Sequence, residues 1–138
     1  MKVYISKSED NTFKIASNFA QKLKKGDIIG LIGDLGAGKT IFVKGVAKYF
    51  GINPDEVVSP TFTIINEYEG KDFFIYHFDL YRIDTKADLE NLGYEEYFTN
   101  KGIVLIEWPE KFEEILNSTN YIVKIEYLNE NLRKVIIK

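Results

Sequence analysis

Two short runs of apolar residues lie far apart along the chain. Residues 28–32 are nearly all apolar and continue into a glycine-rich turn, and residues 103–106 are fully apolar and end at Glu107. Strands that are apolar on both faces are typical of parallel sheets covered by helices. The pattern therefore predicts two parallel strands in the centre of a sheet.

Four other stretches have the spacing or the boundary residues of helices. The first has apolar residues at positions 13, 16, 20 and 23, and we expect this amphipathic helix to begin at Asn11 or Thr12. The second follows the glycine-rich turn to about Phe50 and is stopped by Gly51. The remaining two are expected from Asp84 or Thr85 to Leu92 and from Pro109 to Leu116.

Alternating apolar and polar residues predict strands of a different kind. Residues 63–68 and 73–79 flank a polar turn, as do residues 121–128 and 132–137, and residues 2–6 alternate as well. Such pairs are typical of antiparallel hairpins. Together with the buried strands they predict an α/β fold, with a mixed central β-sheet flanked by helices and antiparallel hairpins at its edge. Repeats and linkers are absent, so we expect residues 1–138 to form a single domain.

The composition of the 138-residue chain excludes several classes of protein. Hydrophobic residues make up 45% and charged residues 28%, which excludes a mainly disordered chain. The net charge of −3 gives no strong cationic field, so we expect another protein to hold any RNA. The absence of cysteine excludes thiolate chemistry and fits a reducing cytoplasm. No apolar run reaches the roughly 18 residues of a membrane span, so no contact with a membrane is expected.

The glycine-rich turn has the full Walker A pattern of a nucleotide-binding loop. Its glycines let backbone N–H groups curl around phosphate oxygens, and the following helix presents its positive end to the same anion. Lys39 adds a mobile positive charge for the outer phosphates, and the Thr40 hydroxyl is the expected ligand of Mg2+. The predicted fold is therefore P-loop NTPase-like, with ATP and Mg2+ as cofactors. The expected binding residues are Gly33, Asp34, Gly36, Ala37, Gly38, Lys39 and Thr40.

Two carboxylates at strand ends are candidates for a second magnesium ligand. Glu107 closes the fully apolar strand, whereas Asp79 closes a strand that is half of a hairpin. Magnesium beside a nucleotide is usually held by one or two carboxylates together with the phosphates. We assign Glu107 to the metal and Asp79 to the water shell of the metal or to the attacking water, and the two roles could be exchanged.

Three other classes of protein share a Walker A loop. Small-molecule kinases usually have several arginines in a lid, whereas this chain has only Arg82 and Arg133. GTPases read guanine with Asn-Lys-x-Asp, and although Asn100 and Lys101 are present, residue 103 is Ile, so ATP is favoured. A noncatalytic ATP-sensing adaptor shares every motif with an ATPase and remains an alternative.

Three further sequence blocks accompany the Walker A loop. They are Ser59-Pro60-Thr61-Phe62-Thr63, His77-Phe78-Asp79-Leu80-Tyr81-Arg82 and Glu107-Trp108-Pro109-Glu110. In this order and spacing the four blocks resemble the TsaE family, also written YjeE. The resemblance implies a bacterial cytoplasmic protein with magnesium-dependent ATP binding and weak ATP hydrolysis. It also implies two partners, TsaD and TsaB, which this chain would support in forming threonylcarbamoyladenosine in tRNA, so that the chain would meet tRNA only through their complex.

The resemblance also implies roles for polar residues outside the Walker A loop. Thr61 is expected to sense the terminal phosphate or its water, and Arg82 to stabilise transition-state charge or to hold an acidic group of a partner. Thr12 and Arg133 are expected near adenine and ribose, although an exposed hairpin arginine is an equal alternative for Arg133. The expected catalytic residues are Lys39, Asp79, Thr61 and Arg82.

Overall fold

The centre of the molecule is one seven-stranded sheet, with the strand order β1-β7-β6-β2-β5-β4-β3. The computed structural model describes residues 1–60 and 62–138. The mixed sheet confirms the predicted α/β class. The strands are β1 Lys2–Ser6, β2 Ile28–Ile32, β3 Ile65–Glu69, β4 Phe74–Asp79, β5 Gly102–Glu107, β6 Tyr121–Asn129 and β7 Leu132–Ile137.

Parallel strands form the middle of the sheet and antiparallel strands form its sides. Strand β2 is parallel to both β5 and β6, and β5 is also parallel to β4. On one side β6, β7 and β1 are antiparallel neighbours, and on the other side β3 pairs antiparallel with β4. The carboxyl ends of β2, β5 and β4 therefore meet at one edge of the sheet.

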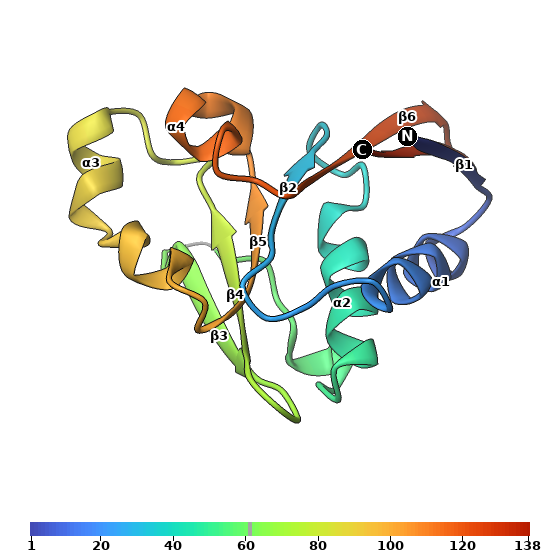
Figure 1. The fold of residues 1–138 in the computed structure, drawn as a ribbon. Coiled ribbons are helices and arrows are strands. Elements are labelled where there is room, and N and C mark those ends of the chain that lie inside the picture. The colour runs from blue at the N-terminus through green and yellow to red at the C-terminus, as the bar shows by residue number, and fades with distance from the viewer. Residues whose placement is uncertain (61) are drawn as a thin grey trace.

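Helices cover both faces of this sheet (Figure 1), with α1 and α2 at the right of the view and α3 and α4 at the left. Within the described residues, no helix has both the length and the apolar character needed to cross a membrane. The α-helices are α1 Glu9–Ala20, α2 Lys39–Tyr49, α3 Lys86–Asn91 and α4 Glu113–Leu116, and the short 3-10 helices are η1 Pro54–Glu56, η2 Tyr94–Phe98 and η3 Pro109–Lys111.

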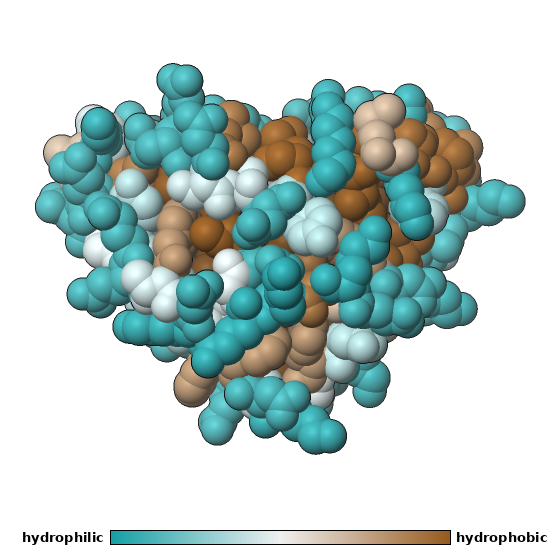
Figure 2. Space-filling view, in the orientation of Figure 1, coloured by the Kyte–Doolittle hydropathy of each residue, from teal (hydrophilic) through white to brown (hydrophobic). Residues whose placement is uncertain are grey.

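Two hydrophobic cores lie on opposite faces of the sheet because successive strand residues point to opposite faces. In β5, Ile103 and Leu105 belong to the core under α1 and α2, whereas Val104 and Ile106 belong to the core with α3 and α4. Figure 2 shows that the outer surface is largely hydrophilic, with apolar side chains gathered over β1 and β6 at the upper right. The faces of the central strands are therefore buried, as the apolar runs predicted.

Two predicted helix boundaries are wrong. Helix α1 begins at Glu9 because Ser8 is its N-cap and the Ser8 side chain accepts a hydrogen bond from the Asn11 backbone N–H. The predicted helix from Pro109 to Leu116 is interrupted at Phe112, whose backbone is extended. The Phe112 side chain is buried in the second core, and this packing outweighs the local helical pattern.

Helices α1 and α2 approach closely at a glycine. A Cβ atom on Gly45 would lie 2.4 Å from the Phe13 carbonyl oxygen and 2.6 Å from the Ala16 Cβ. Real Cβ atoms do not come so close to backbone atoms. Gly45 is therefore needed for the distance between these two helices, and with it for the position of the N-terminal end of α2.

The substitution Gly45→Ala tests this packing. Alanine favours an isolated helix over glycine by about 1 kcal/mol, but the clash with α1 should outweigh this gain and lower the unfolding free energy by about 1–3 kcal/mol. Thermal unfolding followed by circular dichroism measures the difference. The control is Lys48→Ala, an exposed position of the same helix. A melting temperature equal to that of the wild type would contradict the close-packing argument.

Candidate nucleotide-binding site

The Walker A loop joins the end of β2 to the start of α2. Gly36 and Gly38 have φ angles of 80° and 109°, which lie in the left-handed region that residues with a side chain rarely adopt. Gly38 is the N-cap of α2 and offers no side chain to the helix terminus. The first N–H groups of a helix have no partner within it. The loop and α2 therefore present backbone donors and the positive end of a helix dipole to an anion.

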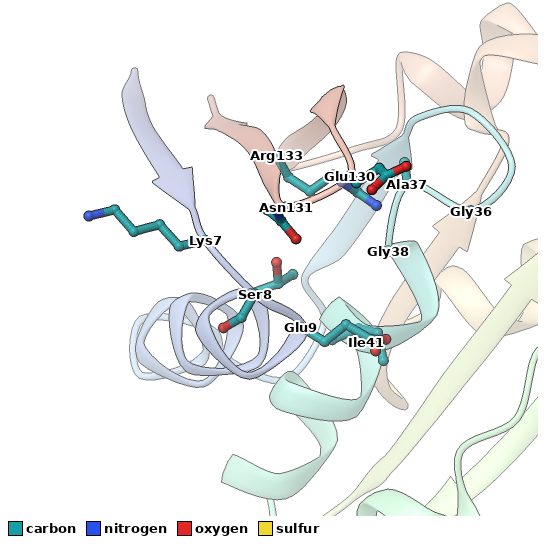
Figure 3. A pocket seen from close by; sticks show the side chains of 11 residues that line it. Lys7, Ser8, Glu9, Gly36, Ala37, Gly38, Ile41, Glu130, Asn131 and Arg133 are labelled. Carbon is teal, nitrogen blue, oxygen red and sulfur yellow. The ribbon is translucent and has the colours of Figure 1, made fainter.

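Two clefts adjoin along this loop. The first has a volume of about 340 Å³ and is lined by the start of α1, the loop and the β6–β7 turn. Figure 3 shows these three segments around a common space, with Glu130 and Asn131 of the β6–β7 turn opposite the start of α1. The second, of about 290 Å³, is lined by the loop, Ser59 and the ends of β4 and β5. Gly36 and Gly38 line both clefts, so a ligand held by the loop can extend into each.

The two predicted carboxylates lie side by side in the second cleft. Asp79 and Glu107 are register partners on the parallel strands β4 and β5, and Glu107 is also in register with Leu31 of β2. Glu107 is therefore on the strand next to the Walker A loop, and Asp79 is one strand farther away. The order of the strands explains why both side chains reach the cleft that Lys39 and Thr40 line.

The charge state of Asp79 is perturbed by burial. Burial raises the pKa of Asp79, and the nearby negative charge of Glu107 raises it further, while a hydrogen bond from the Tyr81 backbone N–H at 3.0 Å opposes the shift. Glu107 is only 4% exposed, and its Oε2 lies 2.6 Å from Nε2 of His77. Two adjacent carboxylates with little access to water favour a bound cation.

These oxygen atoms suit magnesium. Thr40, Glu107 and Asp79 supply a hydroxyl and two carboxylates, which are the hard ligands that magnesium prefers. Among the described residues, no three His, Asp or Glu side chains converge into a complete metal cage. This agrees with the usual magnesium site of a nucleotide-binding protein, where phosphate oxygens and water complete the coordination.

The Walker A lysine is held inside its own loop. Its Nζ donates a hydrogen bond to the Gly33 carbonyl oxygen at 2.6 Å and lies 3.8 Å from the centre of the Trp108 ring. Burial lowers the pKa of Lys39, although the negative charges of Glu107 and Glu110 oppose this shift. Without a strong acidic partner, the ammonium group has charge available for phosphate oxygens.

Trp108 was not among the predicted site residues. Its backbone has a φ of 64°, in the left-handed region, directly after Glu107, and its ring covers Lys39. From the sequence, a tryptophan directly after a candidate metal ligand could pack over the nucleotide site, lie at a partner surface or belong to the core. The unusual backbone conformation that turns the ring over the loop has no signal in the residue pattern.

The residues expected near the base lie in the first cleft. Thr12 lines it but is almost fully buried, and its hydroxyl is 2.6 Å from the Ser6 hydroxyl. Arg133 stacks on Tyr127 at 4.5 Å and donates to the Asn129 carbonyl oxygen at 2.7 Å. The structure thus brings both residues beside the Walker A loop. The lining residues that sequence reasoning missed are Lys7, Ser8, Glu9, Ile41, Glu130 and Asn131.

Of the remaining two predicted catalytic residues, the structure describes only Arg82. Thr61 lies outside the described residues. Arg82 is exposed, and its guanidinium carbon lies 4.9 Å from the centre of the Phe62 ring. Neither cleft is lined by Arg82. In this structure Arg82 is therefore associated with the segment that follows Thr61, away from the two carboxylates.

Several known proteins are similar to this chain over most of its length. A chain of Aquifex aeolicus named tRNA threonylcarbamoyladenosine biosynthesis protein TsaE is 44% identical over 98% of this chain and 94% of its own length. A protein of the same name from Rickettsia conorii is 42% identical over 91% of this chain and 71% of its own length. The crystal structure of Bacillus subtilis YdiB is similar with a TM-score of 0.74 and 31% identity, over 97% of this chain and 82% of that one.

The family model described as threonylcarbamoyl adenosine biosynthesis protein TsaE matches residues 6–135. The match includes all four sequence blocks, the two clefts and the strands that carry the carboxylates. The likeness to YdiB covers nearly the whole chain and supports the predicted P-loop NTPase fold. On the match of the family model and on the identity with these relatives, the chain belongs to the TsaE family.

Proposed function

We propose that the chain binds ATP with magnesium, hydrolyses it slowly, and through this cycle assists a TsaD–TsaB complex in forming threonylcarbamoyladenosine in tRNA. The observation that carries the proposal is the convergence of Lys39, Thr40, Asp79 and Glu107 on one cleft at the N-terminus of α2. The names of the relatives support the assignment of the pathway. The net charge of −3 favours contact with tRNA only through the partner proteins.

Each residue of the second cleft has a role in this proposal. The backbone N–H groups from Gly36 to Thr40 bind phosphate oxygens, and Lys39 exchanges its hydrogen bond with the Gly33 carbonyl for the outer phosphates. Thr40 and Glu107 would hold magnesium, which would supply charge neutralisation to the terminal phosphates. Asp79, with its raised pKa, orients the attacking water or the water shell of the metal.

The arrangement of the arginines supports slow hydrolysis by the chain alone. Phosphoryl transfer is accelerated when an arginine neutralises charge on the transferring group. Arg82 is directed to Phe62 and lies outside both clefts, and Arg133 is tied to Tyr127 and Asn129 in the first cleft. We propose that Thr61 and Arg82 reach the terminal phosphate only after the segments that contain them rearrange.

The surface beside the cleft suits a protein partner. Phe62 is 87% exposed, and the exposed Tyr81 packs against Trp108 with ring centres 5.1 Å apart. Exposed aromatic residues with an adjacent arginine are common in protein interfaces. We propose that the bound nucleotide orders residues 59–63 and 79–82 for this contact, and that hydrolysis releases it.

A noncatalytic ATP-sensing adaptor is the second candidate. The position of Arg82 over Phe62, outside the cleft, favours the adaptor as well. A cleft that lacks an arginine can bind a nucleotide as well as a catalytic cleft does. The two candidates share the binding site and differ in turnover alone.

Nucleotide binding should change the fluorescence of Trp108, which is the one tryptophan of the chain and covers Lys39. ATP is expected to draw Lys39 away from the ring and alter the emission. Lys39→Ala should weaken ATP binding at least about tenfold, because a charged hydrogen bond to phosphate is lost. Isothermal titration calorimetry compares the affinities, with Lys48→Ala as the control. Equal affinity of Lys39→Ala and wild type would exclude the Walker A loop as the phosphate site.

ATP turnover distinguishes the ATPase from the adaptor. Glu107→Gln and Asp79→Asn should each lower turnover about a hundredfold, and Glu107→Gln should also shift the magnesium dependence. Turnover should be slow for the chain alone and should rise when TsaB and TsaD are added. Phosphate release is measured with Lys39→Ala as the blank. ATP binding without turnover, both for the chain alone and with TsaB and TsaD, would favour the adaptor. If Asp79→Asn shifts the magnesium dependence and Glu107→Gln does not, Asp79 is the magnesium ligand and Glu107 has the other role.

A further inference from the structure

A buried chain of polar side chains leads from the second cleft across three strands. His77 is fully buried in β4, two residues before Asp79, and lies between Glu107 of β5 and Tyr68 of β3. Its Nε2 is 2.6 Å from Glu107 Oε2, and its Nδ1 is 3.1 Å from the Tyr68 hydroxyl. The alternation of β4 places His77 and Asp79 on the same face of the sheet, so this series of polar side chains begins at the cleft.

The series of polar groups continues from the Tyr68 hydroxyl to the backbone of Val58. The Tyr68 hydroxyl lies 3.1 Å from the Val58 carbonyl oxygen and 3.4 Å from the Val58 nitrogen. Asn66 Nδ2 also donates to the Val58 carbonyl, at 3.2 Å. Val58 directly precedes Ser59, which lines the second cleft. The polar chain therefore leaves the cleft at Glu107 and returns to it at Ser59.

The directions of these hydrogen bonds follow from the chemistry of the groups. An ionised carboxylate only accepts, so the Nε2–H of His77 donates to Glu107, and Nδ1 of His77 shares a second hydrogen bond with the Tyr68 hydroxyl. Burial raises the pKa of Tyr68, so its hydroxyl keeps the proton that it donates. When Tyr68 donates to His77, the Val58 carbonyl still receives the hydrogen bond from Asn66.

The network is complete and has a specific end point. Among the described residues, no fully buried side-chain nitrogen or oxygen atom lacks a hydrogen-bond partner. The bond from His77 uses Oε2 of Glu107, which leaves Oε1 for a ligand in the cleft. Hydrogen-bonded partners of a metal-binding carboxylate fix its orientation. If His77 and Tyr68 only stabilised the core, they would not need to connect a carboxylate of the cleft with the segment that contains Ser59.

We propose that His77 and Tyr68 are positioning residues, which hold the Glu107 carboxylate toward magnesium and couple its position to the segment that begins at Val58. The proposal rests on the proposed function, since it requires Glu107 to face a magnesium–nucleotide complex. His77 orients the carboxylate directly. Tyr68 orients His77 and, through the same hydroxyl, contacts the Val58 backbone.

The magnesium dependence of nucleotide binding tests the positioning role. Magnesium is titrated into each protein saturated with ADP, and Trp108 fluorescence gives the midpoint. Tyr68→Phe should raise the midpoint about threefold, and His77→Leu about tenfold or more. His77→Gln, which restores a donor to Glu107, should recover part of the loss. The matched control is Tyr76→Phe, because Tyr76 and Tyr68 are both 6% exposed but Tyr76 lies in the other core.

Amide hydrogen exchange, measured by NMR spectroscopy, tests the coupling. Magnesium and ADP together should slow exchange at Val58 and Ser59 in the wild type and in Tyr76→Phe, and should slow it much less in Tyr68→Phe. If Tyr68→Phe keeps both the wild-type midpoint and the wild-type slowing, the positioning role is refuted. Tyr68→Phe keeps the ring, so the test stands even if His77→Leu does not fold.

The outcome for Glu107→Gln separates this inference from the proposed function. If the wild type binds ADP without any magnesium dependence, or if Glu107→Gln has the wild-type midpoint, the proposed metal site fails and the positioning role fails with it. If Glu107→Gln shifts the midpoint while Tyr68→Phe changes neither the midpoint nor the slowing of exchange at Val58 and Ser59, the metal site stands and the positioning role alone is overturned.

Discussion

The parallel register of β2, β5 and β4 is the constraint on which the candidate site depends. Because the three strands point the same way, their last residues come together beside the N-terminus of α2. Glu107 is a register partner of both Leu31 and Asp79, so a shift of one residue in β5 would turn its carboxylate toward the opposite core. The two apolar cores hold this register from both faces and thereby hold the site.

A consequence of this arrangement is a concentration of charge with little water around it. Lys39 and Glu107 are 5% and 4% exposed, and Asp79 is half-buried next to Glu107. Burial opposes the charged forms of both Lys39 and Asp79, so it lowers the pKa of the first and raises the pKa of the second. Phosphate and a divalent cation would offset both effects together. The electrostatics of these residues thus favour the ligand pair that the Walker A loop selects by its shape.

Local features of the structure could be predicted from the sequence, whereas contacts between distant segments could not. Apolar runs identified β2 and β5, and the glycine spacing identified the phosphate loop, because both signals lie within a few adjacent residues. Asp79 and Glu107 were recognised as strand ends, but their pairing required the strand order. The link from His77 to Tyr68 was missed for the same reason. It depends on the register of β3, β4 and β5, which no single stretch of sequence contains.

The position of Arg82 bears most directly on how the chain would act. A guanidinium over the ring of the exposed Phe62 is not available to a phosphate, yet it lies three residues beyond Asp79, whose carboxylate is in the cleft. A small movement of the segment after Asp79 would change which group Arg82 contacts. Phe62 is also the residue that a partner protein would most readily cover, because its side chain is almost fully exposed. A partner that buries Phe62 would compete with Arg82 for the ring, and it would thereby connect complex formation to the chemistry of the cleft.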